Sequence, residues 1–300
     1  MLPFHFIRRS LLFTSTIIVV SSSSFLSIWI ALEINTLAFI PIIKGKAVAK
    51  YFLAQRVGSA IILAGLALNI YSISFVGATI KAGIAPLHFW FPQVMTSISW
   101  FSCALISTWQ KIAPIRIIFS FQNFLFNYLL ILLRLFIGTL GAIKQTQLRP
   151  LIGFSSVVSI GWILRANLEN TFYSVMYISV YLPSTIFLLT ELIKKNRKVR
   201  ADKTISLPLI LFSIAGLPPF IGLLPKITIL TSCPPTFLIP LISASLLVTY
   251  IYSSIAISLI HKVSNVPSQT AIFGVICTPL FITFYSLSTK KYICLPSKRC

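Results

Sequence analysis

Residues 214–226 read Ile-Ala-Gly-Leu-Pro-Pro-Phe-Ile-Gly-Leu-Leu-Pro-Lys, which places three prolines and a lysine inside an otherwise apolar segment. Proline has no backbone N–H and its ring clashes with the preceding helical turn, so a double proline breaks a helix. In a bilayer, a broken helix survives only when it is packed inside protein or lines a wet cavity. The segment therefore predicts a discontinuous helix within a bundle of membrane-spanning helices.

The composition is that of an integral membrane protein. Of the 300 residues, 57% are hydrophobic and only 10% are charged, with a mean hydropathy of +0.94, whereas soluble domains are nearer 25% charged. The net charge of +21 does not indicate nucleic acid as a partner, because the 25 basic residues are scattered between apolar runs. The five cysteines form no CxxC pair and have no metal-ligand spacing, so we expect no metal site.

Eleven apolar segments predict an all-α fold with about eleven transmembrane helices. We expect them at residues 8–21, 25–43, 50–70, 72–91, 98–119, 122–142, 148–166, 171–193, 205–231, 236–260 and 270–288. Most connections are short, so the chain is expected to form a single transmembrane domain over residues 1–300. Basic residues favour one orientation: 14 of the 25 lie on the side of Met1 and six on the other. The N-terminus is therefore expected on the cytoplasm-like or matrix-like side.

A second break is expected at Pro86, which interrupts the span at 72–91, five spans before the break at 214–226. An odd offset makes the two broken spans run in opposite directions, which is typical of inverted-topology repeats. The half-repeats would cover residues 8–119 and 122–260, with 270–288 as an extra C-terminal helix.

Four charged residues lie inside apolar spans: Glu33, Lys81, Lys111 and Lys226. Each charge at the centre of a spanning helix costs about 2.5–3.5 kcal/mol on insertion scales. Removal from water disfavours the charged form, so such groups are candidates for proton transfer. Carbonyls freed at the helix breaks, together with water, would relay the protons. His88 is a weaker candidate that extends the relay only if the break preserves the helix face of Lys81; otherwise it is an interfacial side chain.

Other interpretations of these charges remain open. The side chain of Lys111 could instead extend to the lipid headgroups, as long basic side chains do near helix ends. Pro114 is expected to loosen the backbone one turn beyond Lys111. Glu33 has the alternative of a structural ion pair with a lysine of a neighbouring helix. Arg56 has no assigned role, and for Arg134 we expect contact with lipid headgroups or a partner subunit.

The same residues carry a family resemblance. Residues 81–90 (Lys-Ala-Gly-Ile-Ala-Pro-Leu-His-Phe-Trp) and 108–114 (Thr-Trp-Gln-Lys-Ile-Ala-Pro), with 33–35, 145–149 and 216–226, resemble the subunit 2 family of mitochondrial NADH dehydrogenase. That family belongs to the antiporter-like membrane subunits of respiratory complex I. The resemblance implies a core subunit of NADH:ubiquinone reductase that translocates protons along a mid-membrane axis of charged residues, coupled to quinone reduction elsewhere.

By this resemblance, Glu33 and Lys81 would form the coupling pair, Lys111 the central relay, and Lys226 the group toward the exit or the next subunit. It further implies a multi-pass location in the mitochondrial inner membrane, with the N-terminus in the matrix and the C-terminus on the intermembrane-space side. Expected partners are phospholipids and other membrane-arm subunits, including neighbouring antiporter-like ones. NADH, FMN, iron–sulfur clusters and ubiquinone would belong to other subunits, leaving no redox centre in this chain.

The chain departs from the family at Ser159, where histidine is frequent, so water would have to bridge more of the gap between Lys111 and Lys226. A stand-alone cation/proton antiporter of similar fold is the alternative function, and a purely structural membrane subunit is a third. Four costly buried charges argue against a scaffold, because leucine would avoid the insertion cost.

Overall fold

The computed structural model describes residues 2–120, 124–197, 206–218 and 220–264, and within these residues every regular element is helical. The helices are α1 (Leu2–Ser21), α2 (Phe25–Phe39), η1 (Ile40–Ile42), α3 (Ala47–Ala67), α4 (Tyr71–Ala82), α5 (Trp90–Ser97), α6 (Trp100–Ser107), α7 (Trp109–Ser120), α8 (Phe124–Ile143), α9 (Leu148–Glu169), α10 (Thr171–Arg197), α11 (Ser206–Ala215), η2 (Ile221–Leu223), α12 (Leu224–Ser232) and α13 (Pro235–Ser264). The all-α prediction is confirmed for the described residues. The predicted helix at 270–288 lies outside them.

Five helical stretches of the described chain are long and apolar enough to cross a membrane. They are Phe25–Ile42, Ala47–Ala67, Leu148–Glu169, Thr171–Lys194 and Pro235–Ile260. In the central one, α9, 83% of the most apolar stretch is buried inside the protein, against 28–39% in the other four. Helix α9 is therefore the axis of the bundle, and the other four turn much of their surface outward.

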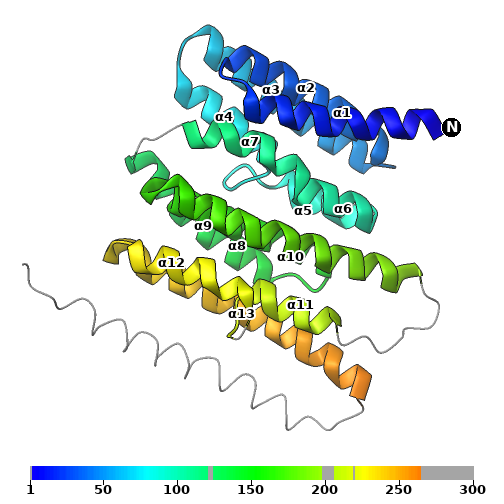
Figure 1. Ribbon diagram of the computed structural model, residues 1–300, viewed down its shortest axis with the longest axis vertical. Coiled ribbons are helices and arrows are strands. Elements are labelled where there is room, and N and C mark those ends of the chain that lie inside the picture. Colours follow the sequence, from blue (N-terminus) through cyan, green and yellow to red (C-terminus); the bar gives the residue numbers. More distant parts are fainter. Residues whose placement is uncertain (1, 121–123, 198–205, 219, 265–300) are drawn as a thin grey trace, which may run out of the picture.

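The helices lie side by side and follow one another along the long axis of the molecule (Figure 1). The helices α1, α2 and α3 form one end, α4 to α7 follow, α8, α9 and α10 come next, and α11 to α13 form the last layer of the described chain. Neighbouring layers are joined by packing of α3 on α4, of α5 on α9, and of α12 on α9. Contacts between helices therefore connect each layer to the next.

Both proline-rich breaks are present where the sequence predicts them. Helix α4 ends at Ala82, followed by Gly83 in the left-handed region at φ 64°, and helix α5 begins only at Trp90. Helix α11 ends before Gly216, at φ 80°, and the next α-helix starts at Leu224. Glycine adopts such positive φ values without the steric cost that a Cβ imposes, so it ends both helices.

A third interruption lies at Thr108, between α6 and α7. The hydroxyls of Ser107 and Thr108 donate to the carbonyls of Cys103 and Ala104, at 2.7 and 2.6 Å, and such local bonds compete with the regular helix. Pro114, by contrast, lies inside α7, which continues through it. The helix is thus interrupted before Lys111 and not at Pro114, where the missing N–H removes one backbone hydrogen bond.

Candidate functional site

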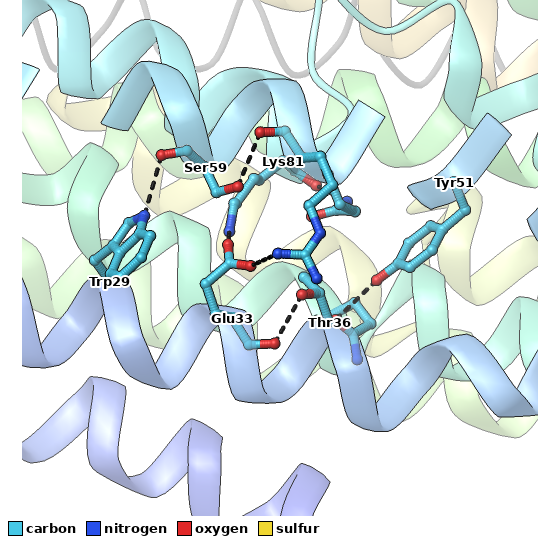
Figure 2. A network of polar contacts seen from close by, with 9 residues as sticks. Trp29, Glu33, Thr36, Tyr51, Ser59 and Lys81 are labelled. Carbon is cyan, nitrogen blue, oxygen red and sulfur yellow. Dashed lines mark hydrogen bonds and ion pairs between the residues drawn. The ribbon is translucent and has the colours of Figure 1, made fainter. Parts of the chain in front are cut away.

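Glu33 lies between two basic side chains from neighbouring helices. Its Oε1 atom accepts a hydrogen bond from Lys81 Nζ (Figure 2), and the two atoms are 2.9 Å apart. Its Oε2 atom is 2.7 Å from a guanidinium nitrogen of Arg56. The Lys81 side chain is 1% exposed and that of Arg56 is 40% exposed. One carboxylate is thus shared by a buried cation from α4 and a partly exposed cation from α3.

The sequence makes room for Lys81 with glycines. A Cβ on Gly58 of α3 would lie 2.7 Å from Lys81 Cγ, and a Cβ on Gly77 of α4 would lie 2.6 Å from the Gly58 carbonyl oxygen. Any larger residue at these positions would push α3 and α4 apart. Their close approach lets the Lys81 stem pass along α3 toward Glu33.

Two carbonyls at the end of α4 accept hydrogen bonds from side chains. The Trp90 indole donates to the Ile80 carbonyl at 3.0 Å, and Gln55 donates through Nε2 to the Lys81 carbonyl, also at 3.0 Å. These bonds satisfy backbone acceptors that a helix end otherwise leaves unpaired. They tie the end of α4 to α3 and to the start of α5.

Lys111 is fully enclosed. Its Nζ donates to Ser156 Oγ on α9 at 2.6 Å and lies 4.4 Å from the centre of the Phe91 ring, with the residue only 4% exposed. An extension to the lipid headgroups is therefore excluded in this structure. The preceding residue, Gln110, donates to Asn35 Oδ1 at 2.9 Å, which ties the α7 segment carrying Lys111 to the helix that carries Glu33.

The Lys226 side chain, on α12, extends toward the C-terminal end of α11. Its Nζ donates to the carbonyl of Ala215, the last residue of α11, at 2.6 Å, and the residue is 8% exposed. The carbonyl end of a helix carries a partial negative charge and favours a cation. A helix end, rather than a carboxylate, therefore stabilises this ammonium group.

Between Lys226 and α9 lies a small cavity of about 20 Å³. It is lined by Ser155, Val158, Ser159, Trp162, Tyr177, Tyr181, Ile214, Lys226, Ser245, Val248 and Tyr252. Six of these residues carry hydroxyl groups and one carries an amine. A polar cavity needs only about 10–15 Å³ to hold a water molecule, so this one has room for one.

His88 is buried but lies apart from the Lys81 helix. Because α4 ends at Ala82, the two residues do not share a helix face, and the condition for extending the relay through His88 is not met. Its Nδ1 atom is 3.2 Å from the Pro86 carbonyl oxygen, and its ring packs edge-on against Phe154. With only 3% of the residue exposed, it is not an interfacial side chain either.

Arg134 is buried inside the bundle, so the expected contact with lipid headgroups or a partner subunit is wrong. The residue is 0% exposed, and its three guanidinium nitrogens have no hydrogen-bond partner in the described part of the chain. We have no physical account of this cation. Arg165 is buried as well, but it pairs with Glu169 one turn along α9 and lies over the Phe237 ring.

Two members of the site have weak or no sequence signals. Arg56 follows Gln55 in an apolar segment, so the pair could be noticed as polar residues but not assigned to Glu33. Ser156 gives no signal, because a single hydroxyl in an apolar helix usually bonds to its own backbone; here it also accepts from Lys111. Among the described residues, no group of three His, Cys, Asp or Glu side chains could hold a metal ion.

The sequence of this chain is similar to a described family. A family model named NADH:quinone oxidoreductase/Mrp antiporter, TM, matches residues 66–252. NADH-ubiquinone oxidoreductase chain 2 of Anopheles gambiae is 33% identical over 287 residues, which cover 83% of this chain and 84% of that protein.

The fold is similar to that of chains in two solved complexes. One belongs to respiratory complex I from Thermus thermophilus, with a TM-score of 0.72 at 19% identity, covering 89% of this chain and 74% of that one. The other belongs to the Mrp complex from Dietzia sp., with a TM-score of 0.71 at 15% identity, covering 84% and 59% of the two chains. At these identities the similarity concerns the fold alone.

Proposed function

The chain belongs to the NADH:quinone oxidoreductase/Mrp antiporter transmembrane family and, within it, to the chain 2 proteins of NADH-ubiquinone oxidoreductase, and from this membership we propose that its buried charges carry protons across the membrane. The chain is a multi-pass subunit of the proton-translocating oxidoreductase, respiratory complex I, in the inner membrane. Its partners are other membrane-arm subunits. We place NADH, FMN, the iron–sulfur clusters and ubiquinone in other subunits.

The observation that supports this function best is the succession of buried cations across the bundle. Lys81 bonds to Glu33 on α2, Lys111 to Ser156 on α9, and Lys226 to the end of α11. All three lysines are at most 8% exposed. Each amine has a partner that tolerates its charged form, and two of the three lack a carboxylate that would hold the proton permanently.

The ion pair of Glu33 is suited to releasing a proton from Lys81. An arginine does not lose its proton in proteins, so Arg56 keeps a positive charge beside the carboxylate at all times. When Lys81 gives up its proton, Glu33 retains Arg56 as a counter-ion and is not left as an unpaired buried anion. The proton is then free to move toward Lys111 in the bundle interior.

We further propose a single transmembrane domain of eleven spans, with half-repeats at 8–119 and 122–260 and an extra helix at 270–288. The two broken helices, α4–α5 and α11–α12, would occupy equivalent places in the halves and run in opposite directions. The surplus of basic residues on the Met1 side supports an N-terminus in the matrix and a C-terminus in the intermembrane space. Phospholipids would cover the outward surfaces of the bundle.

A stand-alone cation/proton antiporter remains the second candidate, and reconstitution separates the two. In liposomes, the purified chain alone is expected to exchange no Na⁺ or K⁺ for protons, because the redox step that drives transport lies in other subunits. The assembled complex in the same liposomes is expected to acidify or alkalinise the lumen on addition of NADH and quinone. Cation-dependent proton exchange by the chain alone that disappears in a Lys111→Met variant would establish the antiporter instead.

Arg56→Met is expected to slow proton translocation by the assembled complex roughly fivefold, equivalent to about 1 kcal/mol. The effect is limited because Arg56 is 40% exposed, and water screens such pairs. Arg56→Lys keeps a cation near Glu33 and is expected to restore most of the rate. The measurement is the initial rate of NADH-driven proton movement in vesicles, normalised to assembled complex. Equal rates in the Met and Lys variants would contradict a role for the Arg56 charge.

A further inference from the structure

Lys111 and Lys226 are separated by a region in which the described chain offers hydroxyl groups rather than ionisable ones. Helix α9 presents Ser155, Ser156 and Ser159 there, and α10 and α13 contribute Tyr181 and Tyr252. This region surrounds the 20 Å³ cavity. We propose that these hydroxyls, with one water molecule in the cavity, form the proton path between Lys111 and Lys226. This proposal rests on the proposed function and specifies the route that the proton takes.

The entrance to this path is bonded in the structure. Lys111 donates to Ser156 Oγ at 2.6 Å, and this hydroxyl donates onward to the Gly153 carbonyl at 2.6 Å. Ser159, one turn further along α9, donates to the Ser156 carbonyl at 2.9 Å and also lines the cavity. Residues three apart on a helix have Cβ atoms about 5–6 Å apart. Rotation of the two hydroxyls away from their backbone acceptors therefore brings Ser156 and Ser159 into one relay.

Two tyrosines hold the far wall of the cavity. Tyr252 of α13 donates to Ser155 Oγ at 2.5 Å, a bond between side chains 97 residues apart in the sequence. The Tyr181 hydroxyl of α10 lies beside Ser159 but has no well-formed hydrogen bond to any described residue, although Tyr181 is only 9% exposed. A buried hydroxyl without a partner costs about 1–3 kcal/mol. A water molecule in the adjacent cavity would satisfy it.

The exit of the path is Lys226, which lines the same cavity. Its Nζ uses one hydrogen for the Ala215 carbonyl, and an ammonium group has three donors, so others remain for the water. The aromatic wall limits the cavity to this size: the Trp162 and Tyr177 rings stack at 6.4 Å on one side. At about 20 Å³, the space fits one water molecule.

The proton balance of this step is simple. The N–H bond of the Lys111 ammonium breaks, and an N–H bond forms on a neutral Lys226 amine. Between them each hydroxyl, and the water, accepts one proton on one side and gives up its own on the other, so each keeps its number of hydrogens. The reverse transfer uses the same groups.

The test uses paired phenylalanine substitutions in the assembled complex. The double variant Tyr181→Phe/Tyr252→Phe keeps both rings but removes both hydroxyls, and we expect proton translocation to fall about tenfold or more. Tyr250→Phe is the matched control, because Tyr250 lies on the same helix as Tyr252 but is 60% exposed; it is expected to leave the rate unchanged. A double variant that pumps at the normal rate overturns the proposal.

Ser159 supplies a second test that does not depend on the tyrosines. Ser159→Ala removes one small hydroxyl with little change in packing and is expected to lower the rate severalfold. Ser159→His, introduced into the double tyrosine variant, places a titratable group at the cavity and is expected to restore much of the rate, which a merely structural role of the tyrosines does not predict. Unchanged transport in Ser159→Ala, or no rescue by histidine, overturns the relay.

These outcomes are separable from a failure of the proposed function. If Lys111→Met stops translocation while the tyrosine and serine variants pump normally, the lysines carry protons by another route. If Lys111→Met also pumps normally, the proposed function itself is wrong.

Discussion

Glu33→Gln is expected to weaken assembly of the complex and to stop proton translocation. The substitution leaves Lys81, with a side chain only 1% exposed, facing Arg56 without an anion between them. Breaking a buried ion pair by removing one partner costs about 3–5 kcal/mol, because the remaining charge is uncompensated. Assembly is measured by native gel electrophoresis, and translocation by the NADH-driven pH change in vesicles.

Two further variants show whether the effect of Glu33→Gln comes from the loss of the Glu33–Lys81 pair. The double variant Glu33→Gln/Lys81→Met removes the stranded charge as well, so it is expected to recover assembly but not translocation. Glu191→Gln is the control, because the Glu191 side chain is 13% exposed, close to the 12% of Glu33, but its partner Lys194 is 66% exposed, so the substitution leaves no buried cation unpaired. Normal pumping by the double variant would show that the Glu33–Lys81 pair is only structural.

Lys111→Met is expected to have opposite effects on stability and on transport. Methionine has nearly the length of lysine without its charge, so the variant avoids an insertion cost of about 2.5–3.5 kcal/mol and assembles at least as well as the natural chain. Transport is expected to fall by a factor of about 100 or more, because the residue that accepts and donates the proton is gone. Assembled amount and NADH-driven proton movement are measured on the same preparation.

Ser156→Ala separates the charge of Lys111 from its position. The variant removes the hydroxyl that accepts from Lys111 Nζ at 2.6 Å but leaves the ammonium buried against the Phe91 ring. We expect an intermediate rate, above that of Lys111→Met and below the natural one. If Lys111→Met pumps at the natural rate in fully assembled complex, Lys111 is not a relay.

The helical fold and both proline breaks follow from the sequence because local chemistry determines them. Proline removes a donor and glycine permits positive φ, and both residue types occur together at each of these two breaks, so the sequence marks a helix end there. Thr108 was missed because a hydroxyl that bonds to its own backbone is common inside regular helices. Pro114 does not end α7, which continues through it without the hydrogen bond that the proline N–H would have made.

The sequence singles out the four charged residues of the candidate site but not the groups that they contact. Glu33, Lys81, Lys111 and Lys226 stand out because charge in an apolar span is costly. Which group each one meets depends on packing between helices far apart in the sequence. Arg56 reaches Glu33 across 23 residues, Lys111 reaches α9 across 45, and Lys226 returns to α11 across 11. No local pattern specifies such distances.

The most direct test of the proton path is a structure of the assembled complex at a resolution that shows ordered water, determined in several states of turnover. We expect one water molecule in the cavity between Ser159 and Lys226, hydrogen-bonded to Tyr181, and a hydrogen-bonded connection from Lys111 to Lys226 in at least one state. A dry gap between Lys81, Lys111 and Lys226 in every state would contradict a lateral proton path through this chain.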